Sequence, residues 1–470
     1  MPSKRIRFGT SGWRAILADE FTFDNVRLAV AAIAGHVKAR SRNPALIVGH
    51  DTRFLSEEFA QTAAGVLAAH HVRPLLCDGA APTPTIAYEI LRRKTDGAIN
   101  FTASHNPADY HGLKFSGADG APALPEVTRE IEERFAQLAA AGRPVPEASH
   151  ADFERIAPRQ PYLERLSELV DLDAIRRAGL RVVCDPLHGA GSGYLDRILA
   201  EAGVAVTAIR TERDVLFDGL GPDVGERNLA PLREAVRRQQ AHVGLATDGD
   251  ADRFGVLDAD GSFVQPNHIL GLLLDYLLET RGWRLGVARS VATTHLLDAV
   301  ARHHGVEVHQ TPVGFKYIGE LIRQGRVALG GEESAGMSIH GHVPEKDGIL
   351  ACLLVAEMMA RRGSMPLAEQ LRALFQKLGA EFWPQRENLA VPETVRAGLP
   401  ERIRGNFSEF AGKKVIQTDR TDGIKLVFAD GSWLLLRSSG TEPLVRIYAE
   451  SSSPPETKRL IGTAKQWLLE

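Results

Sequence analysis

Short apolar runs that alternate with helical stretches are the feature of this sequence that most restricts its fold. In the first quarter of the chain they fall at 45–50, 72–77 and 97–101, separated by helix-like stretches at 56–70 and 85–93. Strands that are joined by helices lie parallel in one sheet, because each helix carries the chain back along the sheet. The alternation therefore predicts an α/β domain.

The same pattern returns twice and then changes. Strands are expected at 180–184 and 243–247, and again at 287–292, 306–310 and 326–329. The last hundred residues instead predict antiparallel hairpins, with turns at Asp422-Gly423 and Asp430-Gly431, and a closing helix at 455–469. A chain of 470 residues exceeds what one core supports. We expect four domains, at 1–155, 156–262, 263–375 and 376–470, with residues 121–158 forming a connecting helix and linker.

Bulk composition excludes several classes of protein. Lys plus Arg number 56 and Asp plus Glu 59, so the positive and negative charges nearly balance. The net charge therefore does not favour binding to nucleic acid or to an anionic membrane. Three scattered cysteines predict buried free thiols in a reducing cytosol. The amino terminus lacks an apolar signal core, and the longest apolar stretch, 349–360, is too short for a bilayer. We expect a cytoplasmic protein.

A polar loop, Asn100 to Pro107, follows the apolar run at 97–101 and holds one candidate nucleophile, Ser104. Ligands of open α/β sheets bind at the carboxyl ends of the strands, because the loops there are free of packing duties. Ser104 is therefore a candidate functional residue. An ordinary polar turn is the alternative interpretation.

A second loop, directly after the run at 243–247, alternates three carboxylates with small residues: Asp248, Asp250 and Asp252. In an extended loop this alternation aims all three at one point, which is unfavourable unless a cation neutralises them. The loop predicts a hard divalent ion, and a solvated acidic turn is the alternative.

Two further loops carry groups that suit a phosphorylated sugar. The loop from Gly330 to Gly336 offers carboxylate and hydroxyl acceptors for vicinal sugar hydroxyls. The segment from Arg437 to Pro443 offers an arginine, hydroxyls and a glycine backbone for phosphate. The glycine-rich turn at 185–193 lacks the spacing of a nucleotide-binding loop, and we interpret it as a packing turn near the site.

Together these loops resemble the α-D-phosphohexomutase family, the phosphoglucomutase and phosphomannomutase group, from Phe8 to Tyr448. The resemblance implies a fold of three tandem α/β/α domains with mixed sheets and a C-terminal α+β, TBP-like domain around a central cleft. It implies that Ser104 is phosphorylated and that one Mg²⁺ is held by Ser104, Asp248, Asp250 and Asp252. Arg14 would lie beside the phosphoserine, and Lys114 would assist proton transfer.

The resemblance also implies a set of substrate-binding residues: Arg253, Glu332, Ser334, Lys346, Arg437, Ser439, Gly440 and Thr441. Lys316 is a second lysine that could face substrate, although either lysine could equally be a solvated charge at the start of a helix. The sequence departs from the family pattern at Ala15, usually glycine, and at Ser438, usually proline. Gly336 stands where the bifunctional phosphomannomutase subgroup has histidine, which favours glucose as the sugar.

The implied reaction is reversible phosphate transfer between hexose 1-phosphate and hexose 6-phosphate, with hexose 1,6-bisphosphate as intermediate and activator. Mannose and glucosamine phosphates remain open as substrates. Two competing functions also remain open, a serine-nucleophile, metal-dependent phosphatase and a binding paralogue without turnover. The partners are then small hexose phosphates, with no nucleic acid and no membrane, and the protein is a monomer or a homodimer.

Overall fold

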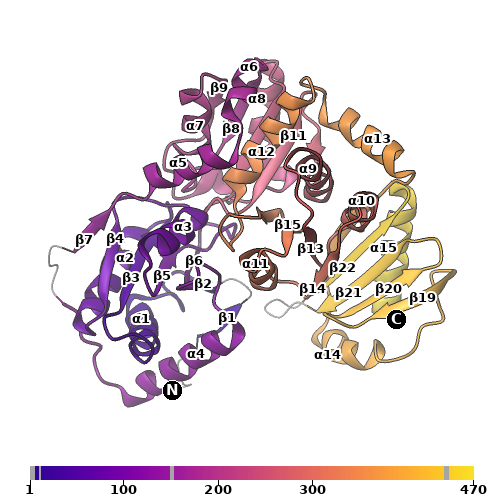
Figure 1. Ribbon diagram of the computed structural model, residues 1–470. Coiled ribbons are helices and arrows are strands. Elements are labelled where there is room, and N and C mark those ends of the chain that lie inside the picture. Colours follow the sequence, from indigo (N-terminus) through magenta and orange to yellow (C-terminus); the bar gives the residue numbers. More distant parts are fainter. Residues whose placement is uncertain (1–5, 10–11, 149–152, 439–443) are drawn as a thin grey trace.

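The computed structural model describes residues 6–9, 12–148, 153–438 and 444–470, and four sheets form within them. Figure 1 shows the sheets following one another along the chain, from the indigo and purple first sheet to the yellow last one. This is the predicted order of three α/β units and one C-terminal sheet unit. Among the described residues, no helix is both long and apolar enough to cross a bilayer.

The first sheet has the order β1-β2-β6-β5-β3-β4-β7 and is mixed, since β3, β4, β5 and β7 run parallel while β1, β2 and β6 pair antiparallel. Its strands are β1 Phe8–Gly9, β2 Gly12–Ile16, β3 Ala45–His50, β4 Arg73–Cys77, β5 Gly97–Phe101, β6 Tyr110–Gly117 and β7 Glu154–Ile156. Its helices are α1 Phe23–Lys38, α2 Ser56–Ala69, α3 Thr83–Arg93 and α4 Pro125–Ala141.

The helix predicted within 121–158 is confirmed as α4, but the segment is more than a connection. Helix α4 packs against α1 and contributes Ile131 and Phe135 to the core of the first unit. Strand β7 adds a further parallel strand beside β4. The segment is part of the first unit because α4 has a buried apolar face, which a solvated connection would not need.

The second sheet has the order β12-β11-β10-β8-β9, with β8, β9 and β10 parallel. Its strands are β8 Arg181–Asp185, β9 Ala205–Ala208, β10 Val243–Thr247, β11 Phe254–Asp258 and β12 Phe263–Val264. Its helices are α5 Arg159–Leu169, α6 Leu172–Arg177, α7 Leu195–Glu201 and α8 Ala230–Arg238, with 3-10 turns η1 Phe217–Gly219 and η2 Glu226–Leu229.

The third sheet has the order β14-β13-β15-β16. Its strands are β13 Gly286–Ser290, β14 Val308–Thr311, β15 Val327–Glu332 and β16 Gly336–Ile339. Its helices are α9 Pro266–Thr280, α10 Leu296–His304, α11 Phe315–Arg323, α12 Gly348–Arg361 and α13 Leu367–Leu378. Helix α12, the longest apolar stretch of the sequence, contacts β10 and β11 of the second sheet as well as β16. The second and third units therefore share one hydrophobic core.

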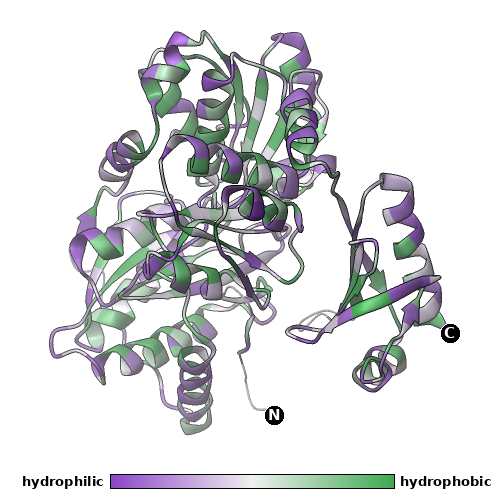
Figure 2. Cartoon of the chain, turned by 45° about the vertical axis from the view of Figure 1, so that its right-hand side comes forward, coloured by the Kyte–Doolittle hydropathy of each residue, from purple (hydrophilic) through white to green (hydrophobic). Residues whose placement is uncertain are grey.

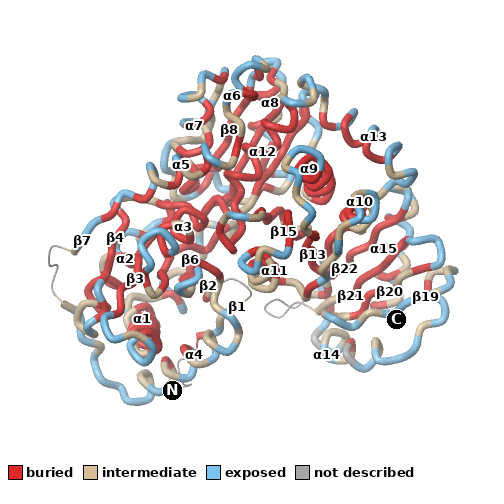
Figure 3. Tube along the Cα trace, viewed as in Figure 1, coloured by how far each residue is buried: buried red, intermediate tan, exposed pale blue. Residues whose placement is uncertain are grey.

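The fourth sheet is antiparallel in the order β17-β22-β21-β20-β19-β18, and α15 packs on it. Its elements are β17 Trp383–Ala390, α14 Glu393–Arg402, β18 Glu409–Phe410, β19 Lys413–Asp419, β20 Ile424–Phe428, β21 Trp433–Ser438, β22 Leu444–Ser451 and α15 Pro454–Leu469. Figure 2 shows this unit beside the rest of the molecule, and Figure 3 shows the buried strands β21 and β22 within it. The hairpins predicted here are confirmed, but sequence reasoning missed β17.

Candidate active site

Ser104 lies just past the carboxyl end of β5, in the left-handed backbone region with φ 52°. Its backbone N–H donates to Thr102 Oγ1 at 2.8 Å, and its side chain is buried. Ser104 Oγ donates a hydrogen bond to Asp248 Oδ2 at 2.8 Å. The serine loop of the first sheet and the acidic loop of the second sheet therefore meet at this side chain.

Arg53 holds the serine loop in place, and sequence reasoning missed it. Its guanidinium, 1% exposed, forms an ion pair with Asp51 at 3.2 Å. It also donates to four backbone carbonyls of the loop, those of Ser104, Asn106, Pro107 and Tyr110. The signal available in the sequence was the segment Asp51-Thr52-Arg53, which follows β3 at the same edge of the sheet.

Replacing Arg53 with methionine should lower the free energy of unfolding by about 3–5 kcal/mol, because Asp51 and four loop carbonyls would lose a buried cation. Urea denaturation measures the change. Arg27→Met is the matched control, since the Arg27–Glu147 pair is partly exposed and should change stability by about 1 kcal/mol or less. Equal effects of the two substitutions would contradict the anchoring role.

The three aspartates of the acidic loop, Asp248, Asp250 and Asp252, are all buried and bring carboxylate oxygens within 4.8 Å of one another. Lys114 Nζ donates to Asp250 Oδ2 at 2.5 Å and to Asp252 Oδ2 at 2.7 Å. Lys346 Nζ lies 2.9 Å from Asp252 Oδ2. Two cations thus partly offset three carboxylates, which explains how the cluster is tolerated away from water.

The charges in this cluster shift one another's pKa. Burial alone would lower the pKa of Lys114, but Asp250 and Asp252 outweigh burial and raise it. Burial alone would raise the pKa of Asp252, but Lys114, Lys346 and Arg253 hold it well below its ordinary value. Burial, with Asp252 and Asp250 nearby, raises the pKa of Asp248 well above its ordinary value.

The donor set of this cluster fits a hard divalent cation. Among the described residues, Asp250 Oδ1 and Asp252 Oδ1 are buried and accept no hydrogen bond. Leaving such oxygens unpartnered is costly, and carboxylate oxygens are the ligands that Mg²⁺ prefers. Thr83, at the start of α3, donates to Asp250 Oδ2 at 2.5 Å and so fixes which oxygen of Asp250 stays available.

The glycine-rich turn at 185–193 supports the acidic loop, which confirms its interpretation as a packing turn. Ala190 N donates to Gly249 O at 2.9 Å. A Cβ atom at Gly189 would lie 2.8 Å from Gly249 O, and one at Gly191 would lie 2.6 Å from Thr247 Oγ1. Only glycine permits this close approach.

A cleft of about 360 Å³ lies next to Ser104 and draws its lining from all four sheet units. Its basic lining residues are Arg7, Arg14, Arg253, Lys346, Arg386, Arg437 and Arg446. Its other polar side chains include His105, Asn106, Glu332, Glu333 and Ser334. Six arginines around one cleft suit a ligand that carries phosphate, because guanidinium and phosphate form paired hydrogen bonds.

The structure places the predicted substrate-binding residues Arg253, Glu332, Ser334, Lys346 and Arg437 in this cleft, along with Arg14. Ser439, Gly440 and Thr441 lie outside the described residues. Arg14 Nη1 donates to Asn106 Oδ1 at 2.7 Å, two residues beyond Ser104. Arg7 belongs to the segment 7–14, whose two arginines suit phosphate oxygens, and it lines the cleft with Arg14. Sequence reasoning assigned no role to His105 and missed Arg386 and Arg446, which carry no motif of their own.

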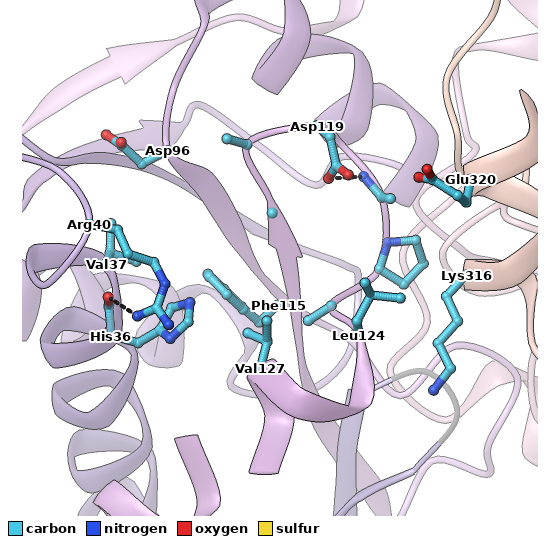
Figure 4. A pocket seen from close by; sticks show the side chains of 15 residues that line it. His36, Val37, Arg40, Asp96, Phe115, Asp119, Leu124, Val127, Lys316 and Glu320 are labelled. Atoms are coloured by element: carbon cyan, nitrogen blue, oxygen red, sulfur yellow. Dashed lines mark hydrogen bonds between the residues drawn. The ribbon is translucent and has the colours of Figure 1, made fainter. Parts of the chain in front are cut away.

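Lys316 does not line this cleft. It lies with Glu320 of α11 at a neighbouring cavity of about 500 Å³, whose other walls include Phe115 and Val127 (Figure 4). Of the two lysines considered from the sequence, Lys346 alone lines the cleft beside Ser104. An ion pair with Asp252 holds the Lys346 side chain there.

Glu332 and Glu333 differ in their surroundings. Glu332 is buried, and its Oε1 accepts a hydrogen bond from Gly314 N at 2.7 Å. Burial and the neighbouring Glu333 raise the pKa of Glu332 to about 7. Glu333 accepts from Ser290 Oγ at 3.1 Å and from Thr293 Oγ1 at 3.4 Å, so it is held by the third sheet unit.

The chain matches all four domains of one family, described as phosphoglucomutase/phosphomannomutase. The α/β/α domains I, II and III match residues 5–141, 160–261 and 265–378. The C-terminal domain of the family matches residues 390–463.

Relatives match along almost the whole chain. A Thermococcus kodakarensis protein named phosphoglucomutase/phosphomannomutase is 32% identical, over 97% of this chain and 96% of its own length. A Thermobifida fusca phosphoglucosamine mutase is 31% identical, over 95% of this chain and 94% of its own length. A crystal structure from Thermus thermophilus has 33% identity and a TM-score of 0.86, with 99% of each chain covered.

Proposed function

Because this chain belongs to the phosphoglucomutase/phosphomannomutase family and is a phosphohexomutase, we propose that it interconverts glucose 1-phosphate and glucose 6-phosphate through a phosphorylated Ser104. The observation that carries this proposal is the position of Ser104. Its hydroxyl donates a hydrogen bond to Asp248 and lies next to a cleft that is lined by six arginines.

In the proposed reaction, phosphorylated Ser104 gives its phosphoryl group to the free hydroxyl of the substrate. The bond between Ser104 Oγ and phosphorus breaks as the bond between the sugar oxygen and phosphorus forms, and the proton of the sugar hydroxyl ends on the released Ser104 Oγ. The resulting glucose 1,6-bisphosphate turns around, and its other phosphate returns to Ser104 Oγ. The bisphosphate also serves as the activator that phosphorylates a free enzyme.

The residues around Ser104 support this chemistry by balancing charge. A phosphoserine carries about −1.5 to −2 charges, and Arg14 lies close enough to the loop to offset part of it. Asp248, Asp250 and Asp252 would hold one Mg²⁺ together with an oxygen of the phosphoserine. When bound, this ion neutralises the charge that develops on the phosphoryl oxygens. Lys114, bonded to Asp250 and Asp252, is proposed to assist proton transfer.

Glu332 and Ser334, which line the cleft, are proposed to bind sugar hydroxyls. Such paired acceptors fix the orientation of a sugar ring. Arg437, with Ser439, Gly440 and Thr441, is proposed to bind the phosphate that is not reacting. We propose that each protein chain binds one hexose phosphate in this cleft.

The preference for glucose over mannose is supported by the packing at Gly336. A Cβ atom there would lie 2.2 Å from Lys346 Cδ, and Lys346 is itself tied to Asp252. The histidine of the bifunctional subgroup would therefore need Lys346 to leave its place. Glucosamine phosphate remains the second candidate, because relatives of similar identity are named phosphoglucosamine mutases.

The proposed function is tested by a coupled assay that compares glucose, mannose, glucosamine and N-acetylglucosamine 1-phosphates at equal concentration. Glucose 1-phosphate should give the highest kcat/KM. A higher value for another sugar would overturn the sugar assignment, and release of inorganic phosphate in place of the 6-phosphate would indicate a phosphatase.

The KM for glucose 1-phosphate should fall as the pH rises through about 7, because Glu332 has a pKa of about 7 and accepts sugar hydroxyls best when ionised. Between pH 6 and pH 8 the ionised fraction rises about tenfold for such a pKa. The substrate phosphate also titrates in this range, so the difference between wild type and Glu332→Gln isolates the carboxyl. Identical profiles for the two proteins would remove Glu332 from the binding of the sugar.

A further inference from the structure

Asp422 lies in the turn that joins β19 to β20, where sequence reasoning predicted only a turn. The next residue, Gly423, has φ 90°, and a Cβ atom there would lie 2.3 Å from Leu436 O of β21. Only glycine allows the turn to lie this close to β21. The close approach brings Asp422 next to Arg437, which follows Leu436 on the same strand.

Each carboxylate oxygen of Asp422 accepts a hydrogen bond from a different unit of the molecule. Asp422 Oδ1 accepts from Arg437 Nε at 2.8 Å, within the C-terminal unit. Asp422 Oδ2 accepts from Val313 N at 3.2 Å, in the third unit. Both side chains of the ion pair are mostly shielded, with 14% of Arg437 and 24% of Asp422 exposed. A charged hydrogen bond is stronger where water is partly excluded.

The residue after Val313 extends this chain of contacts to the sugar-binding carboxylate. Gly314 N donates to Glu332 Oε1 at 2.7 Å, and Gly314 has φ 132°, a conformation that side chains rarely adopt. Two consecutive N–H groups therefore donate to two carboxylates, Val313 N to Asp422 of the C-terminal unit and Gly314 N to Glu332 of the third unit. Val313, Gly314, Glu332 and Arg437 all line the cleft. Asp422 contacts two of them, Val313 and Arg437.

We propose that Asp422 is a positioning residue that couples the phosphate-binding Arg437 to the sugar-binding Glu332. This inference rests on the proposed function. Asp422 accepts a hydrogen bond from Arg437 Nε and so fixes the plane of the guanidinium, while the two Nη nitrogens would contact the phosphate. By accepting from Val313 N, the same carboxylate also holds the neighbouring Gly314 N in place to donate to Glu332. Asp422 would therefore position both the phosphate-binding and the sugar-binding side chain.

The chain offers a matched control on the same hairpin. Asp419 Oδ2 accepts from Gln310 Nε2 at 2.5 Å, so it also joins the C-terminal unit to the third unit. The hydrogen bonds of Asp419 reach Gln310 and Thr421, not Arg437 or Val313. Asp419→Asn therefore perturbs the contact between the C-terminal unit and the third unit, but leaves the contacts of Asp422 with Arg437 and Val313 unchanged.

The test measures binding of glucose 6-phosphate and of inorganic phosphate by calorimetry, and turnover of both hexose phosphate isomers, on the full-length protein. Asp422→Ala should weaken binding of both isomers by about tenfold, as expected for a coupling between two sites. Asp422→Asn keeps an acceptor oxygen for Val313 but loses the charge that faces Arg437, so its effect should be intermediate. Asp419→Asn should stay within about twofold of wild type, as expected of an uncoupled site.

Arg437→Ala and the double variant Asp422→Ala/Arg437→Ala complete a double-mutant cycle, which measures whether the two side chains act independently. If Asp422 acts through Arg437, the double variant should bind phosphate no more weakly than Arg437→Ala alone. In Asp422→Ala the fall of KM with pH should move to higher pH, because a displaced Gly314 N–H would stabilise ionised Glu332 less. A role in folding alone would leave this pH unchanged.

Additive effects of Asp422→Ala and Arg437→Ala would overturn the proposal, as would an equal effect of Asp419→Asn. If Asp422→Ala fails to fold, Asp422→Asn carries the same cycle. A wild type that turns over no hexose phosphate would refute the proposed function, and the inorganic phosphate cycle would still decide whether Asp422 acts through Arg437.

Discussion

Replacing Ser104 with alanine should abolish mutase turnover, with a loss in kcat on the order of 10³-fold or more, because Ser104 is the proposed carrier of the transferred phosphoryl group. Ser104 is the hydroxyl that lies against Asp248 at the cleft. Intact-mass and peptide analysis of the purified wild type should show one phosphoryl group on Ser104. The alanine variant should lack it.

The Ser104→Ala protein should still bind glucose 6-phosphate, since the arginines of the cleft are unchanged, so calorimetry separates lost chemistry from lost binding. Ser167→Ala is a suitable control, because Ser167 Oγ bonds only Leu163 O of its own helix among the described residues. Retention of wild-type turnover in Ser104→Ala would refute the phosphoserine mechanism.

Removal of divalent metal should abolish turnover reversibly and leave the protein folded. The three aspartates of the cluster keep Lys114 and Lys346 as counter-charges, so the fold does not depend on the ion alone. Added Mg²⁺ should restore activity. At about 100 times its Kd it should also raise the free energy of unfolding by about 2.7 kcal/mol, since it binds only the folded state.

Magnesium titration followed by calorimetry checks the site without relying on turnover. Asp250→Asn should weaken Mg²⁺ binding, because Asp250 Oδ1 is one of the buried oxygens that accept no hydrogen bond among the described residues. Asp260→Asn, in the exposed β11–β12 turn, should not. Full activity in excess chelator, or equal Mg²⁺ binding by the two variants, would remove the cluster from the metal role.

The sequence by itself determined the sheet units and the loops that bear chemistry. Runs such as 97–101 and 243–247 are apolar, short and bounded by turn residues, so they predict core strands from local pattern alone. Ser104 and Asp248 follow such strands directly. Their residue types limit their chemistry to that of a nucleophile and a hard metal ligand, whatever the surrounding fold.

The tertiary structure decided what depends on contacts between distant residues. Strand β17 has a polar middle, Gln385 to Asn388, that is exposed or half-buried, and it is a strand because β22 pairs along its whole length. The segment Asp51-Thr52-Arg53 lies at the same sheet edge as Ser104, but local pattern does not show which groups Arg53 or Asp422 contacts. Their roles come from loop carbonyls or a backbone N–H more than 50 residues away. Burial, ion pairing and close backbone approach are set by packing across units, and local sequence pattern does not encode which partners meet.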